Sequence, residues 1–292
     1  SADRLAVEIL RSKLPDLLAR IEPSPKPINL TLPTISTLLK GRDSLLENLQ
    51  HSLGRIPTST NTPVIARVLN GLGGVGKTRL AVEYAWRHTD DYTALLFVVA
   101  DSAEALQRNL AALCRPLALE QQPETDESKQ RDAVLAWLRQ HPGWLLILDN
   151  ADTEKAATAI EALVPHLFGG HLLITTRLIN WSHCLQVLPV DTLSPAAAVE
   201  FLLARTQTMR RPLPGDPAQA GILADTLGNL ALALEQAGAY ICQRRLSFEG
   251  YLQQWYRQRD QVLSWYDARQ MQYPKSVAVT WQTSFDQLST AA

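Results

Sequence analysis

One stretch of the chain combines glycines, a lysine and a threonine at a spacing that can bind phosphate. Residues 71–78 read Gly-Leu-Gly-Gly-Val-Gly-Lys-Thr, a full match to G-x-x-x-x-G-K-[ST]. Glycines let the backbone curl until successive N–H groups point inward at phosphate oxygens. Lys77 then supplies positive charge to the outer phosphates, and Thr78 offers its hydroxyl to Mg²⁺. An apolar run at 64–69 precedes the motif and an amphipathic one follows. The sequence therefore predicts a strand, a P-loop and a helix.

A second apolar run, at 144–148, is followed by Asp149. A carboxylate at the C-terminal end of a buried parallel strand faces the crevice where such sheets bind ligands, so we expect Asp149 to hold Mg²⁺ through water. The alternative is an Asp that caps the next helix. Many ATPases carry a second acid at the next position, which here is Asn150. An amide cannot accept the proton of the attacking water, so hydrolysis is expected to be slow.

A third apolar run, at 172–176, ends in Arg177. A cation at a strand end in a phosphate crevice can sense a γ-phosphate through a charge-assisted hydrogen bond. The alternative is a surface arginine paired with an acid on a helix. The place of Arg177 in the series of strands favours the sensor role.

Alternating strands and helices are needed to position these residues. Near-continuous apolar strands separated by helices are typical of a parallel sheet covered on both faces. The predicted fold class is therefore α/β, a P-loop NTPase with a five-stranded parallel sheet, followed by a small all-α domain. Strands are expected at 64–69, 94–100, 144–148, 172–176 and 186–190, and helices at 78–90, 102–114, 128–140, 153–163 and within 194–268.

Four segments follow from this pattern. Residues 1–35 are expected to form a helix and a proline-rich linker, 36–192 the nucleotide-binding domain, and 193–275 the helical domain. Residues 276–292 begin another amphipathic helix, interpreted as the start of a truncated third domain. The first residue is Ser1 and not Met, which predicts that the chain is part of a longer protein.

Taken in order, the motifs resemble the NB-ARC family of STAND ATPases, which includes plant disease-resistance proteins, apoptosome scaffold proteins and bacterial relatives. Residues 39–43 are similar to the family's hhGRE motif, 145–150 to its Walker B strand, and 227–234 to its LGGLPLAL segment. Residues 279–285 resemble the opening of its winged-helix domain. The motif sequences are most similar to those of bacterial members that carry tetratricopeptide repeats.

The resemblance implies a site that binds ATP or ADP with Mg²⁺ between two domains. It places the Arg177 strand between the P-loop and Asp149 strands, and the base between the 41–42 and 230 regions. The implied catalytic residues are Lys77, Asp149, Asn150 and Arg177, and the implied metal residues are Thr78 and Asp149. The implied nucleotide-binding residues are Leu39, Lys40, Gly41, Arg42, Gly73, Gly74, Val75, Gly76, Lys77, Thr78, Arg79, Leu230 and Ala231.

The chain departs from the family pattern at several of these positions. Lys40 replaces an apolar residue, Asp43 replaces Glu, and Ala231 replaces the proline that packs against the nucleotide. Asn150 replaces the second Walker B acid.

Composition narrows the functional classes. The chain has 28 Lys and Arg against 29 Asp and Glu, a net charge of −1, which argues against a dedicated nucleic-acid or anionic-membrane surface. Its three cysteines show no disulfide or metal spacing, and no apolar run approaches a membrane span, so a cytoplasmic protein is expected.

The leading hypothesis is a nucleotide-operated signalling switch whose partners are missing effector and sensor domains and, on activation, other copies of itself. One alternative is a P-loop kinase or phosphotransferase, which would need an acceptor pocket and an arginine-rich lid. The other is an ATP-dependent transcriptional regulator, which would need a helix-turn-helix domain.

Overall fold

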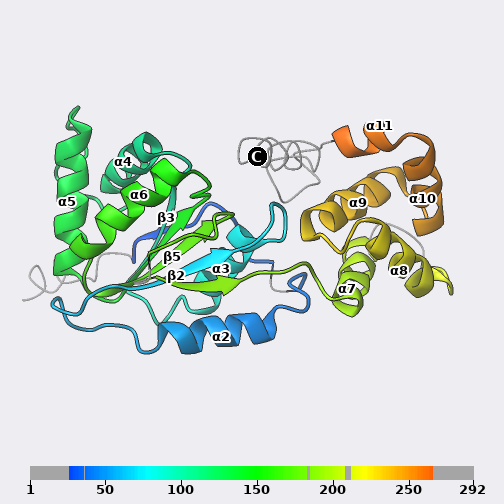
Figure 1. The fold of residues 1–292 in the computed structure, drawn as a ribbon, viewed down its shortest axis with the longest axis horizontal. Coiled ribbons are helices and arrows are strands. Elements are labelled where there is room, and N and C mark those ends of the chain that lie inside the picture. The colour runs from blue at the N-terminus through cyan, green and yellow to red at the C-terminus, as the bar shows by residue number, and fades with distance from the viewer. Residues whose placement is uncertain (1–25, 36, 183–184, 208–211, 266–292) are drawn as a thin grey trace, which may run out of the picture.

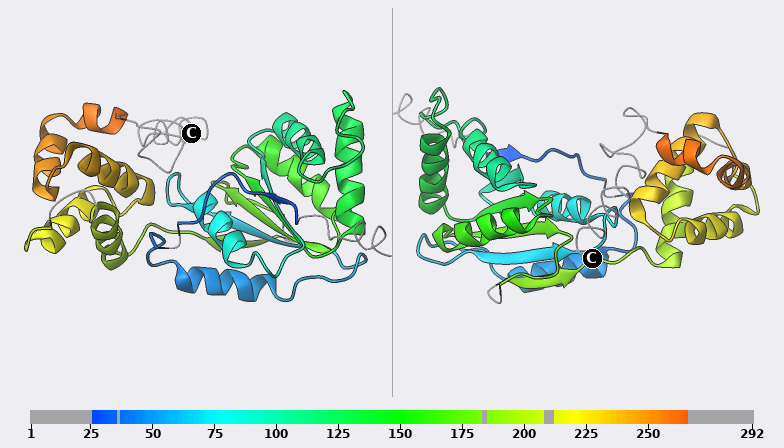
Figure 2. Two further views of the ribbon diagram at one scale, coloured as in Figure 1. Left: turned by 180° about the vertical axis from the view of Figure 1, so that it is seen from behind. Right: turned by 45° about the horizontal axis from the view of Figure 1, so that its top comes forward.

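The computed structural model describes residues 26–35, 37–182, 185–207 and 212–265. Two parts are visible, an α/β domain and a group of helices at one end of it (Figures 1 and 2). The helix predicted near the N-terminus and the winged-helix opening predicted from residue 276 lie outside the described residues.

The sheet has six parallel strands in the order β1-β3-β4-β5-β2-β6. As the resemblance implied, the strand before Arg177 lies between the P-loop strand and the Asp149 strand. The strands are β1 (Ile28–Asn29), β2 (Ile65–Asn70), β3 (Ala94–Val99), β4 (Trp144–Asp149), β5 (Gly170–Thr176) and β6 (Gln186–Pro189).

The prediction of five strands was wrong by one, because the edge strand β1 comes from the proline-rich segment. Ile28 pairs with Leu95 of β3, and the Leu95 N–H also donates to the carbonyl of Pro27, at 2.9 Å. Proline can contribute a carbonyl to an edge strand although it has no N–H. Two residues are too few to show a period of two, so the segment had the appearance of a linker.

Helices cover both faces of the sheet (Figure 1). On one face α2 (Asp43–Leu53) and α3 (Lys77–Arg87) pack on alternate residues of the central strands, including Leu145 and Ile147. On the other face α4 (Ala103–Ala111), α5 (Glu127–Gln140) and α6 (Glu154–Leu163) pack on the intervening residues. Short 3₁₀ turns, η1 (Ala112–Cys114) and η2 (Val164–His166), extend α4 and α6.

The local signals that start these helices are visible in the sequence. Ser102, Asp126 and Thr153 each precede a helix, and each side-chain oxygen accepts a hydrogen bond from a first-turn N–H. Such caps satisfy backbone donors that would otherwise have no partner. The predicted helices of the α/β domain are therefore confirmed, with ends shifted by up to three residues.

The helical domain contains α7 (Pro195–Thr206), α8 (Asp216–Thr226), α9 (Ala231–Arg244), α10 (Phe248–Arg257) and α11 (Arg259–Ser264). Ser194 caps α7 and Pro195 is its first residue, as the sequence predicted. In α10, Trp255 is buried whereas Tyr256 is 70% exposed, which gives the helix one packed and one solvated face. None of the helices within the described residues is both long enough and apolar enough to cross a membrane.

Three connected polar side chains are buried in the core of the α/β domain. The hydroxyls of Tyr84 and Tyr92 lie 3.1 Å apart, and the Tyr92 hydroxyl is 2.8 Å from Nδ1 of His171 on β5. His171 is fully buried, and burial lowers its pKa to about 4, with the charge of Arg67 on β2 lowering it further. The imidazole is therefore neutral in the folded protein at pH 7.

We expect the free energy of unfolding to decrease as the pH falls below the ordinary histidine pKa of about 6.5. The folded state holds His171 neutral down to about pH 4. In the unfolded state, His171 binds a proton below about pH 6.5. The free energy of unfolding therefore loses nothing through His171 above that pH and loses an increasing amount below it. At about pH 5.5 the loss is roughly 1.4 kcal/mol.

Urea unfolding between about pH 7.5 and 5.5 measures this slope. His171→Gln keeps an acceptor for the Tyr92 hydroxyl but does not titrate, so its slope should be smaller. An equal slope in both proteins would contradict the assignment to His171.

Candidate functional site

The P-loop connects β2 to α3 and folds around its own lysine. Gly74 and Gly76 have φ values of 84° and 99°, in the left-handed region that glycine adopts without strain. The Lys77 ammonium donates to the carbonyls of Gly71 and Leu72, at 2.8 and 2.9 Å. Burial lowers its pKa to about 8, which Asp152 and Asp149 oppose and Arg177 reinforces. The loop therefore encloses a cation at the N-terminus of a helix.

Asp149 lies beside the hydroxyl expected to share a metal ion with it. Thr78 Oγ1 donates to Asp149 Oδ1 at 2.6 Å, and Thr175 Oγ1 donates to the same oxygen at 2.7 Å. Burial raises the pKa of Asp149, and the two hydroxyls act against that shift. The two residues expected to hold the metal therefore lie in contact in the structure.

The donor set of this pair suits Mg²⁺. A hydroxyl and a carboxylate are oxygen ligands, and Mg²⁺ bound in this way keeps several waters and takes its other ligands from phosphates. No group of three or more His, Cys, Asp or Glu that could hold a metal is found in the part of the chain that the structure describes. An all-protein metal cage is not needed for such a site.

Asn150 has a backbone reason for its identity that the sequence does not reveal. Its φ is 66°, a left-handed conformation in which Asn and Asp are enriched. Its N–H donates to Thr175 Oγ1 at 2.9 Å, and its carbonyl accepts from the Asp152 N–H at 2.8 Å. The turn after β4 is therefore tied to β5 through Thr175.

Arg177 is held by an acid that the sequence reading missed. Its Nε is 3.0 Å from Asp152 Oδ2, and its backbone N–H donates to Asp152 Oδ1 at 2.7 Å. The two side chains are 18% and 9% exposed. Both influence the pKa of Lys77, so they lie close to the P-loop cation. A signal existed, because Asp152 follows Asp149 by three residues and the ends of β4 and β5 are adjacent.

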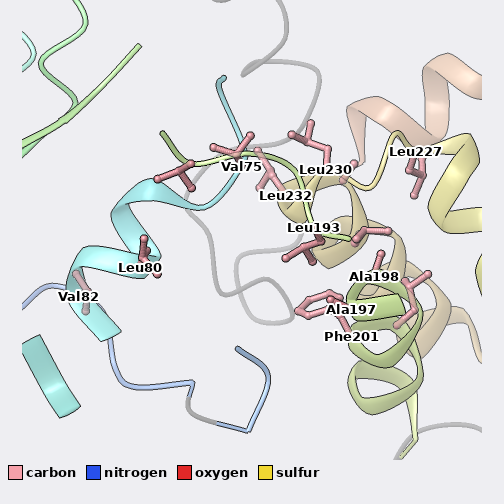
Figure 3. Close-up of a cluster of buried hydrophobic side chains, with 14 of the residues drawn as sticks. Val75, Leu80, Val82, Leu193, Ala197, Ala198, Phe201, Leu227, Leu230 and Leu232 are labelled. Carbon is pink, nitrogen blue, oxygen red and sulfur yellow. The ribbon is translucent and has the colours of Figure 1, made fainter. Parts of the chain in front are cut away.

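A cavity of about 80 Å³ lies beside the P-loop, between the α/β domain and the helical domain. Its walls are mainly apolar. Figure 3 shows Val75 of the P-loop near Leu230 and Leu232, with Leu193 and Phe201 on the same side of the helical domain. Of the predicted nucleotide-binding residues, Leu39, Lys40, Arg42, Gly74, Val75, Gly76, Arg79 and Ala231 line this cavity.

Several lining residues were absent from the prediction. Ile35 and Leu38 come from the segment before α2, Leu193 and Phe201 from the entry to the helical domain, and Glu235 from α9. Glu235 is paired with Arg205, at 3.0 Å.

The helical domain contacts the P-loop directly. The Leu232 N–H, in the first turn of α9, donates to the Gly74 carbonyl at 3.0 Å. A Cβ at Gly74 would lie 3.2 Å from Leu232 Cβ and 3.4 Å from Leu230 Cδ2, and one at Gly76 would lie 3.8 Å from Ala231 Cβ. The Leu230–Ala231 segment is therefore placed against the P-loop backbone.

Two arginines predicted to bind nucleotide are engaged with backbone carbonyls. Arg42 Nη2 donates to Val75 at 2.9 Å and to Asp191 at 2.7 Å, and Arg42 is 8% exposed. Arg79 Nη1 donates to the Pro33 carbonyl at 2.8 Å. Arg42 thus joins the P-loop to the start of the segment that leads into the helical domain.

A strand, a P-loop, a helix and an acid at the end of the next parallel strand but one define the P-loop NTPase class. No family model matches the sequence. The chain is 26% identical over 207 residues to a nucleotide-binding leucine-rich repeat (NLR)-like protein of Hyaloscypha variabilis, covering 63% of this chain and 20% of that protein. It is 28% identical over 238 residues to the regulatory protein AfsR of Streptomyces griseus, covering 77% and 23%.

The fold is also found in solved structures. The Aeropyrum pernix ORC1 protein, solved in complex with DNA, matches with a TM-score of 0.53 and 16% identity over 78% of this chain and 66% of that one. Identity at this level shows a shared fold only.

The motifs and the curated relatives together support an NB-ARC/STAND-type P-loop ATPase. The aligned region makes up about a fifth of each curated relative.

Gly41 provides a test of the contact between the domains. Its φ is 63°, and a Cβ there would lie 2.5 Å from the Cβ of Ala197 on α7. We expect Gly41→Ala to reduce the free energy of unfolding by the strain of a left-handed alanine, roughly 1–2 kcal/mol, plus about 1–3 kcal/mol of overpacking.

Gly228→Ala is the matched control, because Gly228 has the same φ of 63° but no atom within 4 Å of the added Cβ. It should show the backbone strain alone in the same denaturant titration. Equal losses in the two variants would mean that α7 does not press on Gly41.

Proposed function

We propose that the chain is the ATP- and ADP-binding switch module of a signal-transducing STAND protein, with slow ATP hydrolysis. The observation that carries the proposal is the hydrogen bond from Leu232 of α9 to Gly74 of the P-loop, beside a cavity walled by both domains. A ligand in that cavity touches two domains at once, so its γ-phosphate can change the angle between them.

The phosphates would replace the carbonyls that now accept from Lys77. The Lys77 ammonium donates to the carbonyls of Gly71 and Leu72. An anion is a stronger partner for a cation than a carbonyl, so Lys77 would turn to the β- and γ-phosphates, while the N–H groups of 73–78 cradle them.

The metal pair and the sensor would lie on the γ-phosphate side. Thr78 and Asp149 would hold Mg²⁺, which neutralises phosphate charge when bound. Arg177, oriented by Asp152, would donate to the γ-phosphate. Asn150 cannot accept a proton from water, which keeps turnover low.

The base would lie in the cavity beside the loop, against Leu39, Lys40, Arg42 and Ala231. Gly41 and Leu230 would support this side by packing on α7 and on the P-loop. The apolar lining suits a flat aromatic ligand with few polar contacts.

We propose further that the module works within a longer cytoplasmic protein. The aligned region is 20% and 23% of the two curated relatives, which leaves room for effector and sensor domains outside it. Exchange of ADP for ATP would favour self-association. We do not propose DNA as a partner. The similarity to ORC1 is limited to the fold, and with a net charge of −1 the chain has no excess of cationic side chains for the phosphates of DNA.

Removing the P-loop cation tests nucleotide binding. We expect Lys77→Ala to weaken ADP and ATP binding by about 100-fold or more, because a buried charge-assisted contact to phosphate is lost. Isothermal titration calorimetry and mass spectrometry of co-purifying nucleotide measure this. Lys155→Ala, at an exposed lysine of α6, should bind as the wild type does. Tight binding that survives Lys77→Ala would refute the site.

Restoring an acid at position 150 tests the account of slow hydrolysis. Asn150→Asp should raise phosphate release at least about tenfold, because a carboxylate can act as general base and Asp tolerates the left-handed backbone there. Asn150→Gly also accepts that conformation but adds no base, so its turnover should match the wild type. No acceleration in Asn150→Asp would show that the missing base does not limit turnover.

A further inference from the structure

The segment that precedes α2 runs from the edge of the sheet toward the helical domain (Figure 2, left). After β1, residues 32–35 lie along α3, and residues 37–39 continue to the cavity. We call residues 32–35 and 37–39 the N-terminal strap.

Three residues of α3 bind the strap, and they are spaced to lie on one face of that helix. Trp86 Nε1 donates to the Leu32 carbonyl at 2.9 Å. Arg79 donates to the Pro33 carbonyl at 2.8 Å. Glu83, four residues after Arg79, accepts from the Thr34 hydroxyl at 2.9 Å and from the Ile35 N–H at 3.0 Å. Positions i, i+4 and i+7 share one helix face.

Glu83 is the central contact because its carboxylate is fully buried. A buried charge is tolerated only where hydrogen bonds or an opposite charge compensate it. Each of its oxygens accepts a hydrogen bond from the strap, and Arg87 Nε lies 4.0 Å from Oε1. The strap therefore supplies donors that Glu83 would otherwise have to obtain from water.

The other end of the strap forms one wall of the cavity. Ile35, Leu38 and Leu39 line it, and the Leu38 N–H donates to the Ile35 carbonyl at 2.6 Å. Since α3 begins at Lys77 of the P-loop, the same helix holds the phosphate site at its first turn and the cavity wall at its second.

We propose that Glu83 is a positioning residue that holds the strap against α3 and so closes the base side of the nucleotide cavity. This rests on the proposed function, because it assigns the cavity to the base. A displacement of the strap would then change the affinity of the protein for the base, while the contacts of the P-loop with the phosphates stay in place. The strap is thus a route by which a preceding domain could bias the nucleotide state.

The test compares a ligand with a base to one without. ADP and inorganic tripolyphosphate, each with Mg²⁺, are titrated into wild type, Glu83→Ala and Thr34→Ala. We expect Glu83→Ala to weaken ADP binding about tenfold or more, through loss of both strap contacts, and tripolyphosphate binding less than twofold. Thr34→Ala changes nothing on α3 and should weaken ADP binding by about threefold with the same selectivity.

Hydrogen exchange at the Ile35 amide provides a second readout. It should quicken in Glu83→Ala and slow when ADP binds to the wild type, because ADP would pack against the strap. Glu104→Ala, at an exposed glutamate of α4, is the control and should change neither measurement.

Three results would overturn the proposal: equal losses for ADP and tripolyphosphate, unchanged ADP affinity in Glu83→Ala, or unchanged exchange at Ile35 on adding ADP. Equal losses would mean that Glu83 supports the P-loop helix and not the base pocket. Failure of the wild type to bind ADP at all would instead refute the proposed function.

Discussion

The structure depends on one interaction, the enclosure of the Lys77 ammonium by the backbone of its own loop. The cation is bonded to the carbonyls of Gly71 and Leu72, and its burial lowers its pKa to about 8. A half-buried cation that is hydrogen-bonded to neutral carbonyls favours the binding of an anion. The sheet order brings Asp149, Asp152 and Arg177 to the same crevice, and the first turn of α9 closes over the loop from the other domain. Phosphate recognition and the contact between the domains are therefore parts of one site.

Much of this arrangement could be predicted, because short sequence patterns indicate where the strands end and the helices begin. Strands β2 to β5 are largely apolar runs of six or seven residues. Asp149 and Arg177 lie at strand ends, and Lys77 starts a helix. The carboxyl ends of parallel strands meet at one edge, so Thr78 and Asp149 were expected to lie together although 71 positions separate them. The helices of the second domain were equally visible from Ser194 and Pro195 onward.

What could not be predicted depends on pairings that no local period records. Strand β1 has two residues and a preceding proline, so only its pairing with β3 defines it. Asp152 had the appearance of a loop acid, and its role emerges only from its contact with Arg177, 25 positions away. Glu83 fits an ordinary amphipathic helix, yet it is fully buried because the strap crosses it. Asn150 was interpreted by its chemistry alone, whereas its left-handed backbone also selects for it.

The proposed switch requires that nucleotide in the P-loop control the angle between the two domains. Spin labels on cysteines introduced at Glu104 of α4 and Tyr256 of α10, both exposed, report that angle as a distance distribution by pulsed electron paramagnetic resonance. With Mg²⁺ present, we predict distinct distributions for ADP and for a non-hydrolysable ATP analogue, and loss of that distinction in Lys77→Ala. Identical distributions with both nucleotides bound would contradict the account, because the γ-phosphate would then have no effect on the domain arrangement.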